Sequence, residues 1–290
     1  MESDISNNIV KCPICRQPMI LAGHANYSNR SSQYKTPMYQ CSPCDIFYRV
    51  VDDAVMIDHY YAVSYVQKEY ESWYYDSRIN FFEFILVLAL KYAKANSKEQ
   101  TQQLSLVDFG SSFGHLLELA KIKEIKAIGV ELNEDCLLSC KQKGLTVYKD
   151  IKEIPEKVDI ITTIDSLYCV PNCREILAEM KNALKTDGIL VVRITNRNLY
   201  AKFMKRYVYK GDLSTIGDAI ISHSLKSLKK LFALTGFQLL KVIPDHGKGK
   251  RLSFKKNVYY LLGYILTLLT AKRFIITPGI IVIAKPNTRV

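Results

Sequence analysis

Residues Leu106-Val-Asp-Phe-Gly-Ser-Ser-Phe-Gly-His115 decide the fold of this 290-residue chain. A short apolar run ends in Asp108, small residues follow from Gly110 to Gly114, and an amphipathic run begins at Leu116. This order is typical of a buried strand, a tight glycine turn and the first turn of a helix. Because glycine has no side chain, such a turn lets a ligand approach bare backbone and the N-terminus of the helix.

A second acidic residue ends the next apolar run, Ala127-Ile-Gly-Val-Glu131. One strand–helix–strand unit separates Asp108 from Glu131, so we expect both carboxylates at the same edge of a sheet. An acid in the second position can hold the two hydroxyls of a ribose. We predict that His115, directly after the turn, is a partly exposed residue of the first helical turn.

Apolar runs and helical patterns alternate from residue 104 to the end of the chain. The predicted strands lie at 104–109, 127–131, 146–148, 158–164, 188–194, 237–243 and 280–284, and the clearest helices at 134–143, 172–185 and 225–234. Such alternation predicts an α/β fold with a mainly parallel sheet that helices cover on both faces. Residues 80–94 are almost continuously apolar and predict a buried helix.

Four of the eight cysteines form two C-x-x-C pairs, Cys12 with Cys15 and Cys41 with Cys44. Two such pairs can place four thiolates tetrahedrally around one ion, which predicts a structural zinc site in a small zinc-ribbon lobe. A segment this short needs a staple to fold, and four protein ligands leave no position for a catalytic water. The alternative is a lobe with four free thiols.

We therefore divide the chain into three parts. Residues 1–50 form the zinc-ribbon lobe, residues 51–103 an aromatic helical connector, and residues 104–290 the α/β domain. The connector is rich in tyrosine, and we favour packing of these rings on the main domain over a lid above a substrate.

The formal net charge of +12 suits anionic partners such as nucleic acid, phosphorylated substrates or a lipid surface, and equally a solvated surface rich in lysine. The first eight residues lack the pattern of a secretory signal, so we expect a cytoplasmic protein, in which cysteines stay reduced.

Residues 246–277 form an insertion where the fold needs only a hairpin. Its apolar run, 258–270, is too short as a helix, at about 1.5 Å per residue, to span a hydrocarbon core of about 30 Å. Two interpretations stay open. The helix packs against the sheet or a second copy, or it lies in a membrane interface as a peripheral contact, with the basic residues of 248–273 around it.

Together these residues resemble class I S-adenosylmethionine-dependent methyltransferases, in a bacterial subgroup with an N-terminal zinc ribbon. Residues 108–114 resemble the first motif, Glu131 the ribose acid, 150–151 the adenine loop, and 165–172 the loop over the methionine part. The resemblance spans residues 75–290 and implies a Rossmann-like, doubly wound sheet of seven strands whose last strand is antiparallel.

The resemblance also implies that S-adenosylmethionine is a co-substrate. The positions that would bind it are Asp108, Gly110, Ser111, Ser112, Gly114, Glu131, Leu132, Asp150, Ile151 and Asp165. Two positions depart from the family pattern. Ser112 stands where the first motif often has glycine, and Tyr168-Cys169 stands where many relatives have Glu-His.

The implied reaction is methyl transfer to a small-molecule, glycan or lipid-linked acceptor, with a hydroxyl as the favoured nucleophile. The leaving thioether is neutral, so the enzyme mainly aligns the nucleophile and excludes water, and a general base assists a hydroxyl. Tyr168 and His223 are weak candidates for contact with the acceptor, and His223 also fits a helix-capping cluster.

Three other functions share parts of this pattern. An RNA methyltransferase suits the ribbon and the charge, but the basic residues are not interleaved with aromatic rings, which disfavours nucleic acid. A non-catalytic ribbon module with a vestigial donor site is a second alternative. Nicotinamide-binding folds share the glycine turn and the later acid, but the acid that ends the first strand favours the methyl donor.

Overall fold

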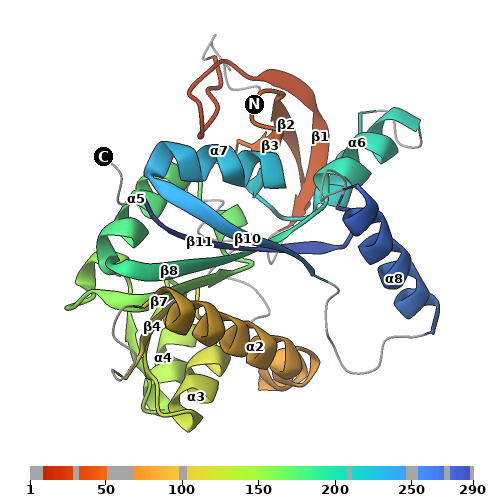
Figure 1. The fold of residues 1–290 in the computed structure, drawn as a ribbon. Helices are drawn as coiled ribbons and strands as arrows, with labels where there is room; N and C mark the ends of the chain where they lie inside the picture. The colour runs from red at the N-terminus through yellow and green to blue at the C-terminus, as the bar shows by residue number, and fades with distance from the viewer. Residues whose placement is uncertain are drawn as a thin grey trace.

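A computed structural model of the chain describes residues 9–28, 33–50, 68–97, 103–207, 211–245, 254–270 and 275–287. Its main body is a sheet of seven strands with helices on both faces, and a four-stranded sheet stands beside it (Figure 1). The α/β class and the seven-stranded sheet predicted from the sequence are thereby confirmed.

The large sheet has the strand order β10-β11-β8-β7-β4-β5-β6. Its strands are β4 (Ser105–Phe109), β5 (Lys126–Val130), β6 (Thr146–Tyr148), β7 (Val158–Ile164), β8 (Leu184–Thr195), β10 (Phe237–Asp245) and β11 (Gly279–Pro286). Strand β11 is antiparallel to both β8 and β10, whereas the pairs formed by β4 to β8 are parallel. The parallel strands therefore all end at one edge, which we call the carboxyl edge.

One boundary differs clearly from the prediction. Helix α5 (Cys173–Ala183) ends early, and β8 begins at Leu184 instead of residue 188. Leu184 is buried and pairs with Val158 of β7. This apolar residue has helical spacing in the sequence, which is why it was predicted in the helix, but it belongs to the sheet.

The main helices pack on the two faces of the large sheet. They are α2 (Lys68–Asn96), α3 (His115–Ile122) and α4 (Glu134–Gln142) on one face, and α5 and α7 (Leu225–Thr235) on the other (Figure 1). Along β4, Leu106 packs in the core under α2 and α3, and Val107 packs in the core under α5 and α7. This alternation is the period of two expected of a strand buried on both faces.

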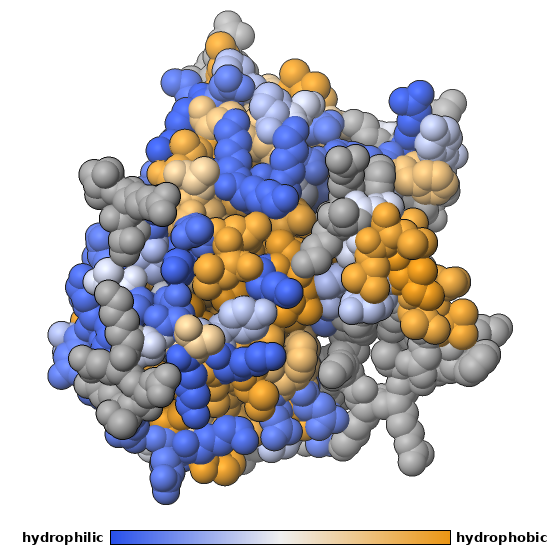
Figure 2. Space-filling view, in the orientation of Figure 1, coloured by the Kyte–Doolittle hydropathy of each residue, from blue (hydrophilic) through white to orange (hydrophobic). Residues whose placement is uncertain are grey.

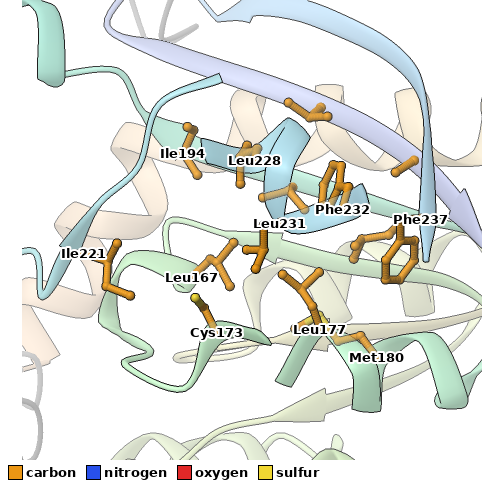
Figure 3. Close-up of a cluster of buried hydrophobic side chains, with 14 of the residues drawn as sticks. Leu167, Cys173, Leu177, Met180, Ile194, Ile221, Leu228, Leu231, Phe232 and Phe237 are labelled. Atoms are coloured by element: carbon orange, nitrogen blue, oxygen red, sulfur yellow. The ribbon is translucent and has the colours of Figure 1, made fainter. Parts of the chain in front are cut away.

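Figure 3 shows the core under α5 and α7. Leu231 and Phe232 of α7 project toward Leu177 and Met180 of α5, and all four side chains are buried. Burial of this kind contributes about 1.5–3 kcal/mol for each large side chain, which makes it the main source of stability for this layer.

Helix α2 joins the end of the aromatic segment to the apolar run that was predicted as a separate buried helix. That prediction was too strong, because Ile85 and Leu86 are buried but Val87 is half exposed. The helix lies on the surface of the sheet and buries only one face. Tyr60, Tyr61 and Tyr65 of the tyrosine-rich connector lie in 51–67, outside the described residues.

Strands β1 (Ile20–Ser28), β2 (Gln33–Cys41) and β3 (Ile46–Arg49) form an antiparallel sheet in the N-terminal lobe. The fourth strand of that sheet, β9 (Ile221–Ser222), comes from the main body and pairs with β3. The lobe is thus joined to the main body through shared main-chain hydrogen bonds.

Arg49 secures this junction and is fully buried. Its guanidinium donates to the carbonyl oxygens of Ala219 at 3.3 Å, Gly217 at 2.5 Å and Asn26 at 3.1 Å, and to Thr36 Oγ1 at 2.8 Å. One side chain therefore pairs with acceptors from both parts of the chain, and those of Thr36 and Ala219 are buried.

Helices α6 (Asn198–Tyr207) and α8 (Phe254–Leu269) complete the fold. Helix α8 contains all but the last residue of the predicted apolar run 258–270 and begins four residues before it. Within the described ranges, no helix combines the length and the apolar character that crossing a bilayer demands.

Replacing Arg49 tests the importance of the junction. Arg49→Leu removes the donor of two buried acceptors, at Thr36 and Ala219, and of two part-buried ones, so we expect a loss of about 3–5 kcal/mol in the free energy of unfolding. At about 2–4 °C per kcal/mol, the Tm should fall by at least about 6 °C in a calorimetric scan. The matched control is Arg16→Leu in the same lobe, which breaks only an exposed ion pair with Glu175 and should change the Tm by less than about 4 °C. Equal losses in the two variants would contradict this assignment.

Candidate functional site

The turn after β4 has a left-handed backbone at three positions. The φ angles are 78° at Gly110, 50° at Ser112 and 79° at Gly114. A Cβ on Gly110 would lie 2.0 Å from Ser166 Oγ, so this position requires glycine. Ser112 adopts the left-handed conformation at a cost of about 1–2 kcal/mol. The turn is therefore preserved although serine stands where the family often has glycine.

The carboxylate of Glu131 holds this turn in place from the end of β5. Its Oε2 accepts from the backbone N–H of Ser112 at 2.7 Å, and its Oε1 accepts from Leu132 and Asn133 at 2.9 Å each. The N–H of Gly110 also donates to the carbonyl of Val130 at 2.8 Å. An ionised carboxylate has about four acceptor positions, so Glu131 keeps capacity for a ligand hydroxyl.

Asp108 lies beside this turn and is almost completely buried, with 4% of its surface exposed. Thr162 of β7 faces it across the parallel register and donates from Oγ1 to Asp108 Oδ1 at 2.7 Å. Burial raises the pKa of Asp108 from 3.8 to about 7, and the negative charge of Glu131 adds to the increase. The site therefore holds a carboxyl group that titrates near neutrality.

A small recess lies between the turn and α2. Its lining residues are Phe82, Asp108, Gly110, Ser111, Ser112, His115, Leu116 and Ile164. Four predicted donor-binding positions thus share one recess. The hydroxyl of Ser111 is buried there, and no hydrogen-bond partner for it lies among the described residues.

His115 is the first residue of α3 and is 4% exposed, which corrects the prediction of a partly exposed residue. Its ring contacts Tyr75 of α2 edge-on at 5.0 Å between centroids and Phe82 at 6.5 Å. Its Nδ1 lies 3.2 Å from Glu118 Oε2. His115 is buried because α2 lies over it. The sequence near His115 contains no pattern that indicates this contact with α2.

Asp165 follows β7 and has a left-handed backbone, with a φ of 56°. Both carboxylate oxygens are engaged, one by Arg193 of β8 and the other by Arg78 of α2 at 3.1 Å. Arg193 also pairs with Asp245 of β10 at 2.7 Å. These four residues form an ion network at the carboxyl edge.

Arg193 and Asp245 are the buried part of this network. Burial lowers the pKa of Arg193, but the charges of Asp165 and Asp245 outweigh it and raise that pKa above its ordinary value. The sequence analysis missed Arg193 and Asp245. A lone arginine within the apolar run of β8 is the signal that could have indicated a buried ion pair.

The remaining predicted donor positions lie on neighbouring loops of the same edge. Leu132 follows Glu131 and is 59% exposed. Asp150 caps the short helix η2 (Ile151–Glu153), since its Oδ1 accepts from Lys152 N at 2.9 Å. Ile151 is buried in the core of the main body. Only Leu132 and Asp150 of this group therefore offer exposed surface.

The two candidates for acceptor contact lie apart from the recess lining. Tyr168 packs against a buried cluster that includes Met38 and Phe47 of the N-terminal lobe. His223 is 1% exposed and precedes Ser224, the N-cap of α7, and burial lowers the pKa of this histidine to about 4. An acceptor cannot reach His223 unless this end of α7 moves.

The four predicted metal ligands come together in the N-terminal lobe. The Sγ atoms of Cys12, Cys15, Cys41 and Cys44 all lie within 4.8 Å of one another, and none forms a disulfide. Four Zn–S bonds of about 2.3 Å place tetrahedral sulfur atoms about 3.8 Å apart. The cluster therefore fits a zinc ion.

The local backbone supports the same interpretation. The residue after each C-x-x-C pair has a left-handed backbone, with φ angles of 61° at Arg16 and 56° at Asp45. The N–H of Ile14 points to Cys12 Sγ at 3.4 Å. Two matching tight turns therefore present the sulfur atoms.

Comparisons with known proteins place these features in context. A family model described as a methyltransferase domain matches residues 66–242. No curated protein matches the chain significantly. A methyltransferase dependent on S-adenosylmethionine from Clostridium acetobutylicum has a similar structure, at 14% identity and a TM-score of 0.46, covering 71% of this chain and 90% of that one.

Two further solved structures are similar. The magnesium protoporphyrin IX methyltransferase of Synechocystis, with bound SAH, has 13% identity and a TM-score of 0.46, covering 73% of this chain and 85% of that one. A plantazolicin methyltransferase in complex with a monoazolic analogue and SAH has 18% identity and a TM-score of 0.49, covering 76% and 91%.

The pKa of Asp108 predicts how stability depends on pH. Between the unfolded value of about 3.9 and the folded value of about 7, the folded state binds more protons, so the free energy of unfolding falls as pH rises. Asp108→Asn has no such proton to lose. Its stability relative to wild type should rise by about 2–3 kcal/mol from pH 5 to pH 8 in urea unfolding. The exposed control Asp135→Asn should follow the wild-type profile, and a parallel course for Asp108→Asn would refute the prediction.

Removing a thiolate tests the metal site. We expect the wild-type protein to contain one zinc ion per chain when its metal content is measured by mass spectrometry. We expect the Cys41→Ser variant to lose both the zinc and the folded N-terminal lobe. Structural zinc contributes apparent binding free energies of about 10–16 kcal/mol, so the change in Tm should be large. The control Cys169→Ser lies outside the cluster and should retain the metal. A wild-type protein purified without zinc, and unaffected by a chelator, would contradict the site.

Proposed function

Because the chain belongs to the methyltransferase-domain family, we propose that it transfers a methyl group from S-adenosylmethionine to a hydroxyl or similar group of a small-molecule acceptor. The observation that carries this proposal is the contact between the glycine turn and Glu131. The carboxylate at the end of β5 accepts the N–H of Ser112, so a ribose-binding acid and a turn of bare backbone lie side by side.

We place the donor along the carboxyl edge. In this arrangement Glu131 accepts a ribose hydroxyl, and Leu132 and the loop at Asp150 flank the adenine. The turn from Gly110 to Gly114 lies under the methionine part. The exposed surface of Leu132 and the remaining acceptor capacity of Glu131 support this placement.

Charge supports the same placement. The donor carries a sulfonium and an ammonium group, and Asp108 brings a carboxyl group to the edge where it would bind, whereas both oxygens of Asp165 are already engaged by arginines. Because Asp108 has a pKa of about 7, a bound cation would favour its ionised form and release a proton. We expect donor affinity to rise with pH through neutrality.

The transfer step itself is an in-line displacement. A lone pair of the acceptor oxygen forms a bond to the methyl carbon while the C–S bond breaks, and the electron pair stays on sulfur as a neutral thioether. The hydroxyl proton passes to a base or to water. Alignment of this kind supplies about 7–11 kcal/mol, so holding the two reactants is the main task of the protein.

The zinc ion has a structural role in this proposal. Four thiolates complete its coordination, so it would stabilise the lobe and offer no open position to a substrate. The lobe contacts the main body through Arg49 and β9, which link it to the segment that leads into α7. The zinc site therefore supports the position of that segment.

Donor binding tests the assignment of Glu131. Glu131→Gln loses one carboxylate oxygen and the negative charge, and a hydrogen bond to a charged group contributes about 1.5–3 kcal/mol. We expect the Kd for S-adenosylmethionine in calorimetry to rise about 10- to 100-fold. The control Glu134→Gln changes an exposed residue three positions away and should leave the Kd unchanged. Equal binding by wild type and Glu131→Gln would remove Glu131 from the site.

Transfer of a labelled methyl group to a cell extract tests the reaction and the acceptor class together. We expect label in the small-molecule or lipid fraction that depends on active protein. Label in RNA would support the nucleic-acid alternative and contradict our proposal. Tight donor binding with no labelled product would support the non-catalytic module.

A further inference from the structure

Helix α8 carries apolar side chains on most of its surface, and these side chains are exposed. The exposed positions are Val258, Leu261, Leu262, Tyr264, Ile265, Leu266, Leu268 and Leu269 (Figure 2). Leu262 is 59% exposed and Leu269 is 79% exposed. Contiguous apolar surface of this kind marks an interaction site in a stable protein.

The contact between α8 and the rest of the protein is narrow. Gly263 and Thr267, one helical turn apart, are its buried positions among the described side chains. A Cβ on Gly263 would lie 3.2 Å from the side chain of Ile276, so glycine lets the helix approach the segment before β11. The interpretation that α8 packs its apolar surface against the sheet is therefore wrong.

Helix α6 presents a second exposed apolar face. Tyr200, Phe203 and Tyr207 are 54%, 53% and 68% exposed, while Ala201 is fully buried. The three aromatic residues lie at helical spacing, and the rings of Phe203 and Tyr207 are 5.1 Å apart. This helix is amphipathic, with aromatic rings on its outer side.

Both helices project from the carboxyl edge of the sheet. Strand β8 ends at Thr195 and α6 follows at Asn198. Strand β10 ends at Asp245, and α8 lies between it and the start of β11, which pairs with the end of β8. Figure 1 shows α6 and α8 on the same side of the molecule. The recess at Asp108 opens from that same edge.

The segments that carry these helices are basic in sequence, and Lys202 of α6 is paired with Asp45 of the N-terminal lobe. Residues 246–277 contain seven lysines and arginines and no aspartate or glutamate. Residues 198–211 contain four and again no acid. Apolar surface with a cationic surround matches the chemistry of an anionic phospholipid bilayer, which offers acyl chains beneath a layer of phosphates.

We propose that α6 and α8 form a docking surface for an anionic lipid bilayer. The leucines and isoleucine of α8 enter the boundary between headgroups and acyl chains, and the tyrosines of α6 lie at the level of the headgroups. A second copy of the chain fits less well. A two-fold interface would bring two sets of these basic residues together, and like charges in an interface are unfavourable.

Docking in this way turns the carboxyl edge toward the headgroups. An acceptor carried in the bilayer could then meet the donor without leaving the interface. This consequence rests on the proposed function, whereas the docking itself does not.

Vesicle flotation tests the docking surface with the full chain. We expect wild type to float with vesicles of phosphatidylcholine and phosphatidylglycerol, and to float far less with phosphatidylcholine alone or at high salt. The test variant carries Leu261→Gln, Ile265→Gln and Leu269→Gln, which lie on one face of α8 and are already exposed. Its partition coefficient should fall by at least about tenfold.

The control replaces three apolar residues of similar exposure on the helices at the other end of the fold, namely Val87→Gln, Ile122→Gln and Leu138→Gln. It should float as wild type does. Donor affinity is measured in parallel, and an unchanged affinity in the α8 variant separates docking from methyl transfer. Three results would overturn the proposal: no flotation of wild type, equal loss in the control, or a lipid-free dimer that the α8 variant converts to a monomer.

Discussion

The hydrogen bond from the Ser112 N–H to the Glu131 carboxylate is the contact on which the site depends. It joins the turn after β4 to the end of β5, beside the bond from the Gly110 N–H to the carbonyl of Val130. The turn needs left-handed backbone at three alternate small residues, Gly110, Ser112 and Gly114, which costs conformational free energy. The carboxylate offsets part of that cost by fixing the one non-glycine residue among them. A site built in this way is preorganised before a ligand arrives.

The ion network at Asp165 has a different role at the carboxyl edge, because it links separate elements of the fold. Arg193 links the end of β7 to β10, and Arg78 brings α2 to the same carboxylate. Buried charges of this kind add little net stability, because desolvation consumes most of the attraction, but they are costly to break. The network therefore fixes four elements relative to one another, namely α2, β8, β10 and the end of β7. It also leaves Asp165 less accessible than a lone carboxylate after β7 would be.

Much of the fold could be predicted from the sequence, because each strand of the large sheet is a short apolar run and each helix has its own spacing. The positions of Asp108, Glu131 and the four ribbon cysteines followed from motif spacing alone. The contacts of Asp108 with Thr162 and of His115 with Tyr75 did not, because they depend on the register between strands and on where α2 lies. The exposure of α8 was also left open, since an apolar run has the same sequence whether it is buried or exposed.

The shared sheet of the N-terminal lobe has a consequence for biosynthesis. Arg49 donates to the carbonyl of Gly217, and 168 residues separate the two positions in the chain. At about 5–20 residues per second, a ribosome needs roughly 10–30 s to add that many residues. The thiolates can capture their ion early, but the edge of β3 stays unpaired until β9 has emerged. During synthesis, the N-terminal lobe thus leaves the ribosome well before β9 but is completed only after it, and its open edge is a target for chaperones.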